Sequence, residues 1–254
     1  MNWYATYSLF RKETTRFVKV WMQTVIAPVV TALLYLLVFA HVLEGRVEVF
    51  PDVSYTSFLV PGLLMMSMIQ NAFANTSSSI IQSKVMGSIL FILLPPFSHL
   101  EFFLAYIGAA VVRGLAVGLG VFLLAVFYID VHQVNVIVIL AFAILGCYIM
   151  GAMGLIAGIW AEKFDQIAAF QSFIIVPLTF LSGVFYSIKS LPPIWYELTK
   201  WNPFFYMIDG FRYGFFGQSD QPVIVSLIIM CVAAILLTLL CLILLRTGYK
   251  LRDA

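Results

Sequence analysis

The sequence has 254 residues, of which 63% are hydrophobic and 10% charged, and its mean hydropathy is +1.03. An ordinary soluble domain carries about 25% charged residues, so this composition excludes a soluble protein. The net charge of +2 comes without a basic block or a basic patch interleaved with aromatic residues, which argues against a nucleic-acid partner. Uncharged apolar stretches of roughly 20 residues, long enough to cross a bilayer as helices, recur along the chain. The sequence therefore predicts an all-α integral membrane protein.

The first 20 residues have the pattern of an amphipathic helix that lies on the membrane surface. A largely aromatic stripe recurs at alternating steps of four and three: Trp3, Tyr7, Phe10, Thr14, Phe17 and Trp21. The basic residues of this stretch lie largely outside the stripe, as suits the boundary between headgroups and hydrocarbon. The helix is expected to serve either as an anchor or as a docking surface for a partner. No small-x-small cleavage site follows promptly, so the first span is taken as an uncleaved insertion signal.

Six membrane spans are predicted within a single domain that covers residues 1–254. They run over 21–43, 57–81, 101–129, 135–160, 168–188 and 222–245. Two connections stand out between them, a segment over 82–100 and a longer, aromatic-rich region over 189–221. No internal repeat, low-complexity tract or soluble domain is visible.

The distribution of basic residues predicts the orientation of the spans. With six spans, both termini share one side with the 82–100 segment and the loop at 161–166. That side carries nine Lys or Arg residues: Arg11, Lys12, Arg16, Lys19, Lys84, Lys163, Arg246, Lys250 and Arg252. The opposite side carries four: Arg46, Lys189, Lys200 and Arg212. Basic residues accumulate on the cytoplasmic side, so both termini are expected to be cytoplasmic.

The 189–221 region, on the predicted outer side, combines helix breaks with unusual aromatic content. Pro192-Pro193 and Pro203 delimit segments that are too short to span a bilayer and too apolar for a solvated loop. Short re-entrant helices covered by protein meet both limits. The predicted outer cap comprises Trp195, Trp201, Phe204, Phe205, Tyr206 and Arg212. A simple aromatic belt that anchors the chain at the interface is the alternative.

Arg113 is the one charged residue well inside a predicted span. A charge near mid-bilayer is costly unless it faces protein or water. Small neighbours, among them Gly114 and Gly118, would let another helix approach closely. Arg113 is therefore expected either to donate to carbonyl groups of packed helices or to bind an anionic substrate.

Uncharged polar residues and methionines within the second and fifth spans suggest where a conduit would lie. The candidates are Met66, Gln70, Asn71, Asn75, Gln171 and Thr179. Methionine surfaces suit adaptable contacts, although packing against lipid explains the methionines equally well.

Several short motifs, in this order, resemble the membrane subunit of type 2 ABC (ABC-2) exporters, particularly small bacterial inner-membrane permeases. They are FLVPGLLMMSMIQNAFAN at 58–75, PLTFLSGVFYS at 177–187, LPP at 191–193, NP at 202–203 and IDGFRYG at 208–214. The motifs are short and individually weak, but their order and spacing extend the resemblance over nearly the whole chain. The resemblance implies a location in the bacterial inner membrane, a second copy of the chain, and two copies of a separate ABC ATPase. It also implies that the substrate passes at the interface between the two copies.

The resemblance further implies that residues 82–100 form a short cytoplasmic helix that contacts the ATPase. The coupling residues expected there are Lys84, Leu90, Leu93, Leu94, Pro96 and His99. Leu90 and Phe91 stand where the family pattern has acidic residues, so the contact is expected to be mostly apolar, with the helix seated in a hydrophobic groove of the partner. Packing of this helix on the chain's own spans is the alternative.

The leading hypothesis is a permease subunit that exports an amphiphilic substrate such as a drug, a lipid or a lipid-linked glycan. The sequence lacks a G-x-x-x-x-G-K-[ST] motif, so ATP and Mg²⁺ are expected on the partner ATPase and no cofactor on this chain. An ion-gradient-driven secondary transporter or channel is the alternative, although acidic residues inside the spans are missing. An intramembrane enzyme is a third hypothesis, but His41, His99 and His132 lie near span ends without metal-type spacing.

Overall fold

The computed structural model describes residues 3–43, 49–50, 53–94, 98–128 and 134–251, and the only strand-like feature in these ranges is an isolated bridge between Phe50 and Val53. The helical elements are α1 (Trp3–Val18), η1 (Met22–Ile26), α2 (Ala27–Leu43), α3 (Tyr55–Val85), α4 (Ile89–Leu93), α5 (His99–Ala125), η2 (Val126–Tyr128), α6 (Val136–Trp160), α7 (Phe164–Phe170), η3 (Gln171–Ile175), α8 (Val176–Phe180), η4 (Ile188–Ser190), α9 (Pro193–Lys200), α10 (Pro203–Phe216) and α11 (Val223–Thr247). η1 and η3 are π-helical turns, and η2 and η4 are 3₁₀ turns.

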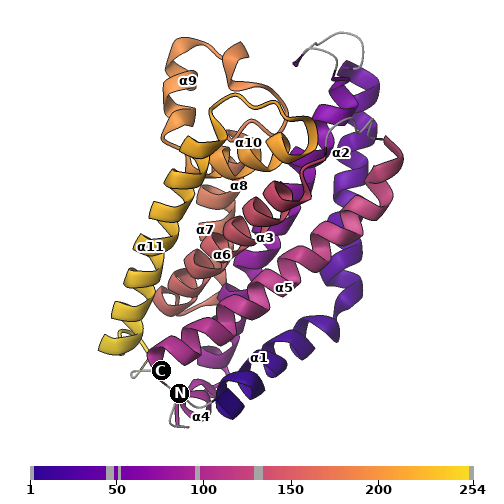
Figure 1. The fold of residues 1–254 in the computed structure, drawn as a ribbon. Helices are drawn as coiled ribbons and strands as arrows, with labels where there is room; N and C mark the ends of the chain where they lie inside the picture. The colour runs from indigo at the N-terminus through magenta and orange to yellow at the C-terminus, as the bar shows by residue number, and fades with distance from the viewer. Residues whose placement is uncertain (1–2, 44–48, 51–52, 95–97, 129–133, 252–254) are drawn as a thin grey trace.

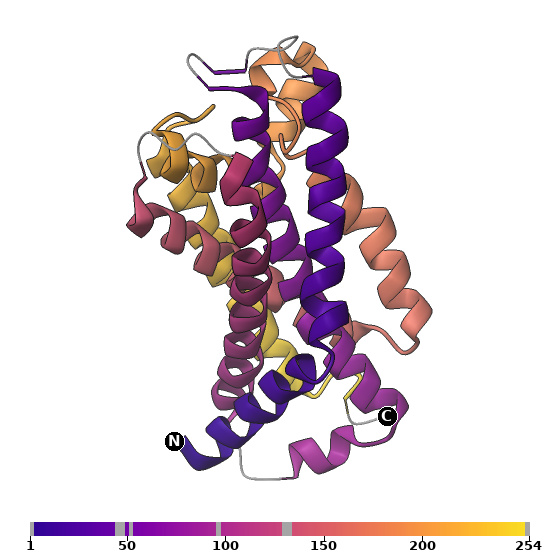
Figure 2. The same ribbon diagram turned by 90° about the vertical axis from the view of Figure 1, so that its right-hand side faces the viewer.

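The long helices form an elongated bundle with two distinct ends (Figure 1). α4, the beginning of α1 and the end of α11 lie at one end, which we call the termini end. α9 and α10 lie at the opposite end, which we call the cap end. α7, η3 and α8 run along one side of the bundle (Figure 2), where their contacts with other elements are confined mainly to α3, α6 and α10.

α3 is the central helix of the bundle and packs against α2, α5, α6 and α10. α6 approaches it closely because Gly154 and Gly158 face it. A Cβ atom at Gly154 would meet the carbonyl oxygen of Phe73, and one at Gly158 would meet Ile80. Small residues one turn apart let two membrane helices pack backbone against backbone, as their spacing predicts here.

Five helical segments among the described residues are long and apolar enough to cross a membrane: Met22–Phe39, Tyr55–Val85, His99–Ala125, Val136–Trp160 and Val223–Thr247. This confirms the prediction of an all-α membrane protein. A sixth apolar segment, Phe164–Phe180, has 17 residues and falls short of the roughly 20 that a span needs. The helix expected over 168–188 thus begins earlier and ends earlier. It ends near Gly183, whose φ of +76° is a left-handed conformation that glycine adopts readily and that interrupts a helix.

The buried residues of the N-terminal helix include one member of the aromatic stripe, Phe17. Thr6, Leu9, Glu13 and Phe17 are its buried residues, and α5 is its main neighbour. Trp3, Tyr7 and Trp21 of the stripe are exposed, so only part of the stripe contacts protein. The exposed aromatic side chains remain available for the membrane surface.

Candidate functional site

A polar stripe runs along α3, the most enclosed helix of the bundle. Between residues 57 and 84, every α3 residue is buried except six on one face, which we call the α3 stripe: Ser67, Gln70, Asn71, Ala74, Ser78 and Gln82. Their spacing of three and four residues places them on one side of the helix. All except Ala74 are polar. Uncharged polar groups on a membrane helix need hydrogen-bond partners from protein or water. The α3 stripe therefore marks a face of the helix that protein or water approaches.

Two arginines from other helices reach the α3 stripe one helical turn apart. The guanidinium of Arg113 on α5 donates to the side-chain oxygen of Asn71 at 3.2 Å. That of Arg16 on α1 donates to the backbone carbonyl of Asn75 at 2.6 Å and to the hydroxyl of Ser78 at 3.2 Å. Arg113 thus donates to the side-chain amide oxygen of Asn71 on α3. An anion-binding role for Arg113 remains a prediction.

Glu13 on α1 is a buried carboxylate that the sequence analysis did not single out. Its side chain is fully buried, 3.3 Å from Nε of Arg16 and 3.2 Å from Nζ of Lys12. Glu13 and Arg16 are three residues apart and therefore on the same face of α1, a spacing that was visible in the sequence. What it did not reveal is that α5 covers this face. Glu13 neutralises part of the positive charge that α1 brings to α3.

The structure brings only some of the predicted conduit residues together. Gln70 and Asn71 belong to the α3 stripe, and Asn75 lies buried beside it. Gln171, which is partly exposed, follows Phe170, whose ring stacks on Phe73 of α3 at 5.7 Å. The remaining two candidates lie elsewhere. Met66 is 8% exposed in the core, and the buried hydroxyl of Thr179 donates to the carbonyl of Ile175 at 2.6 Å.

The predicted coupling segment exposes an apolar surface at the termini end. Leu90 is 49% exposed, and Phe91 and Leu94 are each 74% exposed. Ile89, in contrast, is buried against the bundle. His99 is also exposed. The side chain of Leu93 and the whole of Pro96 lie outside the described residues. We call Leu90, Phe91 and Leu94 the α4 surface.

Lys84 is not part of this exposed surface. Its side chain is buried, and its ammonium donates to the carbonyl oxygens of Ile159 at 2.9 Å and Ala161 at 2.6 Å. These are carbonyls at the C-terminal end of α6, where a helix leaves acceptors unpaired and the dipole favours a cation. Lys84, expected as a coupling residue of the 82–100 segment, thus lies in the last turn of α3 and is buried, because the unpaired carbonyls at the end of α6 lie within its reach.

The predicted outer cap separates into an interior and an exterior. Four of its residues belong to α10 and are buried: Phe204, Phe205, Tyr206 and Arg212. Trp195 and Trp201 are 51% and 86% exposed. Asn202 begins α10 by accepting from the backbone N–H of Phe204 at 3.0 Å, a typical N-cap. Whether these residues act in transport remains a prediction.

Arg212 joins α10 to α3 and to the segment that follows α8. Its guanidinium lies 3.7 Å from the ring centroid of Phe58 on α3, which is a cation–π geometry. It also donates to the carbonyl oxygen of Gly183 at 2.9 Å. Arg212 therefore holds together three segments that are far apart in sequence.

Two buried aspartates that the sequence analysis did not single out complete the cap. Asp209 on α10 accepts from the backbone N–H groups of Asp220 at 2.8 Å and Gln221 at 3.0 Å, which fixes the turn before α11. Asp220 accepts from the hydroxyl of Ser187 at 2.5 Å and from the N–H of Ile188 at 3.0 Å. The cap end is thus tied by buried hydrogen bonds as well as by apolar packing.

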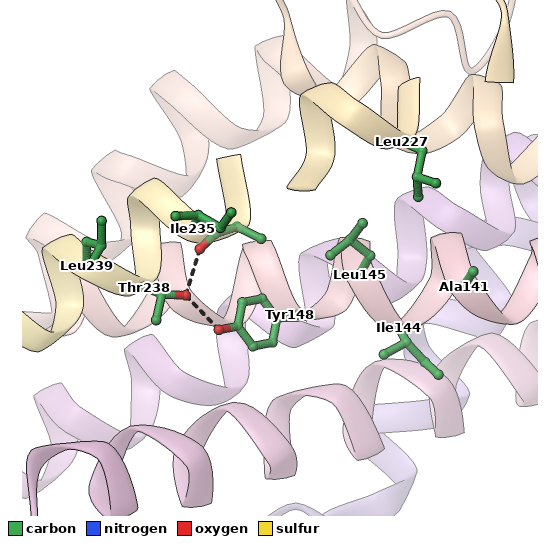
Figure 3. A pocket seen from close by; sticks show the side chains of 9 residues that line it. Ala141, Ile144, Leu145, Tyr148, Leu227, Ile235, Thr238 and Leu239 are labelled. Atoms are coloured by element: carbon green, nitrogen blue, oxygen red, sulfur yellow. Dashed lines mark hydrogen bonds between the residues drawn. The ribbon is translucent and has the colours of Figure 1, made fainter. Parts of the chain in front are cut away.

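An apolar groove between α6 and α11 does not coincide with any predicted site. Its volume is about 570 Å³, and its polar side chains are Tyr148 and Thr238, whose hydroxyls lie 2.6 Å apart (Figure 3). The rest of the lining is aliphatic: Ala141, Ile144, Leu145, Leu227, Ala234, Ile235 and Leu239. No charged side chain lines the groove, so it offers nothing to recognise an ionic headgroup.

Comparison with known proteins gives consistent matches over the whole chain. The family model described as "ABC-2 type transporter" matches residues 4–216. The chain is 37% identical to "Inner membrane transport permease YadH" of Escherichia coli K12 over 253 residues, which cover 100% of this chain and 99% of the relative. It is 21% identical over 237 residues to "Nodulation protein J" of Rhizobium leguminosarum bv. viciae, which covers 91% and 89% of the two chains.

Proposed function

The chain belongs to the ABC-2 type transporter family and is the membrane-embedded permease subunit of an ABC transporter, and we propose that it moves an amphiphilic substrate outward across the bacterial inner membrane. The observation that carries the proposal is the α3 stripe. A polar, uncharged face on the central helix gives a substrate headgroup a route through the apolar bundle, and the lipid-exposed sides of the spans accommodate its apolar part.

The family implies a separate ABC ATPase as partner, and we propose that two copies of it bind two copies of this chain. ATP and Mg²⁺ belong to that partner in this proposal. The ATPase docks on the α4 surface, where Leu90, Phe91 and Leu94 are exposed and fit a hydrophobic groove. The distribution of Lys and Arg supports placing the termini end in the cytoplasm.

In this proposal ATP binding favours one arrangement of the two permease copies and hydrolysis favours the other. A conformational change requires a ligand that binds the two states with different affinity, and ATP on the partner supplies that difference. The permease transmits it through α4 and α1 at the termini end. The substrate then leaves past α9 and α10 at the cap end.

An ion-gradient-driven transporter or channel would require titratable carboxylates along the path. Among the described residues the buried carboxylates are Glu13, Glu101, Asp209 and Asp220. Each is engaged near a helix end or a turn: Glu13 by Lys12 and Arg16, Glu101 by the N–H of Ser98 at 2.7 Å, and the two aspartates within the cap. None faces the α3 stripe from within a span, which favours the ATP-driven mechanism.

Native mass spectrometry of the tagged chain, co-expressed with the ATPase encoded beside it, tests the proposal first. We expect a mass of two permeases and two ATPases. Inverted membrane vesicles that contain the complex should then accumulate a fluorescent amphiphile only with ATP. Accumulation that follows an ion gradient and persists without the ATPase would contradict the proposal and support the alternative.

A further inference from the structure

An unbalanced positive charge, that of Arg113, lies beside the α3 stripe near the middle of the bundle. Arg113 is the fifteenth residue of α5, about 21 Å from its first residue at 1.5 Å per residue. Arg16, one turn further toward the termini end, has Glu13 as a counterion. Among the described residues no carboxylate lies within ion-pair distance of Arg113, so none of these residues compensates its charge.

The hydrogen bonds of Arg113 are also incomplete. A guanidinium has five N–H donors, and here one of them donates to the side-chain oxygen of Asn71 at 3.2 Å. Its Nε is buried without a hydrogen-bond partner, although the side chain as a whole remains partly exposed. A charged group with open donors at this depth is expensive for a membrane protein. An anion that approaches along the α3 stripe would satisfy both the charge and the donors.

The neighbours of Arg113 on α3 point to the same ligand chemistry. Nε2 of Gln70 and Nδ2 of Asn75 are buried and have no hydrogen-bond partner. Both are donors, so Gln70, Asn75 and Arg113 each have an N–H group without a hydrogen-bond partner. Glu13 and Tyr106 have buried oxygens without hydrogen bonds nearby, but Glu13 forms ion pairs with Lys12 and Arg16. Glu13 therefore compensates Lys12 and Arg16, and none of the ion pairs of the described residues includes Arg113.

We propose that Arg113, together with Gln70, binds the phosphate group of an anionic amphiphile, which narrows the substrate class of the proposed exporter. A phosphate supplies several acceptor oxygens in the geometry that a guanidinium fork recognises. The hydrocarbon part remains in the bilayer, since η1 and α2, which pack against α5, expose the apolar side chains of Met22 and Val30. This inference rests on the proposed function, since it places the headgroup site on the transport path.

The test uses the purified permease–ATPase complex and a fluorescent short-chain phosphatidic acid as the probe. The comparator is a diacylglycerol with the same chains and fluorophore, and inorganic phosphate serves as a competitor. The variants are Arg113→Gln, Arg113→Lys and Gln70→Leu. Arg11→Gln is the matched control, because Arg11 is an exposed arginine on α1 outside the site.

We expect wild type to bind the phosphatidic acid at least about tenfold more tightly than the diacylglycerol, as for one charge-assisted hydrogen-bonding group. Arg113→Gln should abolish this preference, and Arg113→Lys should retain part of it. Gln70→Leu, which keeps Arg113, should reduce the preference several-fold. Arg11→Gln should leave it unchanged. Millimolar inorganic phosphate should not displace the probe.

An unchanged preference in both Arg113→Gln and Gln70→Leu would overturn the inference. Displacement of the probe by inorganic phosphate would overturn its amphiphile part and show a site for the free anion. Native mass spectrometry on the same samples separates this inference from the proposed function. An intact complex without phosphatidic acid preference contradicts only the headgroup site, whereas failure to form the complex contradicts the exporter proposal itself.

Discussion

The ammonium nitrogen of Lys84 lies 2.6 Å from the carbonyl oxygen of Ala161, so a side chain from the last turn of α3 caps the C-terminal end of α6. Lys84→Met should therefore lower stability, because it leaves buried carbonyls without a donor. A charged hydrogen bond contributes about 1.5–3 kcal/mol, and a loss of that order is expected. Thermal unfolding of the solubilised chain measures it, with the exposed Lys19→Met as control. Normal stability combined with lost ATPase coupling would restore the docking role for Lys84.

The α4 surface should be required for the ATPase and not for the fold. Leu90→Asp combined with Leu94→Asp adds charge where both side chains are exposed, so membrane levels should stay normal while ATPase co-purification is lost. Ile194→Asp, at a 75% exposed apolar residue of α9, is the matched control at the cap end. Undiminished co-purification of the ATPase with the double variant would place docking elsewhere.

Glu13 should hold α1 against α5 and α3. Glu13→Ala removes the buried carboxylate from Arg16 and Lys12 and should destabilise the chain by about 2 kcal/mol, less than for a fully enclosed pair because both cations are partly solvated. Hydrogen exchange of peptides from residues 3–18 should increase selectively. Glu197→Ala, which removes an exposed carboxylate from an ion pair with Lys200, should leave stability unchanged. Equal effects of the two substitutions would argue against the anchoring role.

Phe205 and Trp201 belong to the same predicted cap but should respond differently to truncation. Phe205 is 1% exposed, so Phe205→Ala should lower the free energy of unfolding by about 3 kcal/mol and reduce the amount of protein in the membrane. Trp201 is 86% exposed, and Trp201→Ala should leave stability unchanged while export falls. Protein levels and ATP-dependent transport, measured together, check both expectations. Unaltered export in Trp201→Ala would leave the exposed part of the cap as an interfacial anchor.

The tail after α11 is held to the turn between α6 and α7 by an ion pair of 2.6 Å between Lys250 and Glu162. The hydrogen bond and charge of Lys250 lower the pKa of Glu162 below its ordinary 4.5, and Glu162 raises the pKa of Lys250 above 10.5. The stabilisation is therefore present from pH 4.5 to 10.5. It is lost as pH falls through the pKa of Glu162 or rises through that of Lys250.

At pH 7, Glu162→Gln should speed hydrogen exchange in peptides that contain residues 248–251. Below the pKa of Glu162, variant and wild type should exchange at equal rates, since the wild-type carboxylate is then also neutral. A difference that persists at low pH would show that the ion pair does not hold the tail.

The membrane class and most helices could be predicted because hydropathy and length are properties of local segments. α6 and α11, for example, are continuous apolar helices of 25 residues each. The end of α8 could not be placed, because the turn at Gly183 is stabilised by Arg212, which lies 29 residues later. Helical periodicity identified the aromatic face of α1, but it could not show that α5 covers the face with Glu13.

The residues of the candidate site could be predicted from local sequence, but their arrangement could not. Gln70, Asn71, Asn75 and Arg113 were recognisable as polar residues in apolar surroundings, a signal that the sequence carries directly. Their grouping with Arg16 depends on how α1 and α5 pack on α3, which no local pattern encodes. Met66 and Thr179 were also chosen by residue type, but the fold directs their side chains into the core.

The π-helical turn η3 determines how α7 and α8, the two halves of the Phe164–Phe180 segment, are rotated relative to each other about the helix axis. In a continuous α-helix Phe170 and Thr179 would lie on opposite sides, because nine steps of about 100° add up to two and a half turns. The wider turn over 171–175 accommodates one extra residue, so the angle between Phe170, which stacks on Phe73, and the buried Thr179 falls from about 180° to about 80°. Deleting any one residue of η3 would turn one half against the other by about 100°, and one of these two anchors would be lost. The number of residues in this segment is therefore constrained more tightly than their identity.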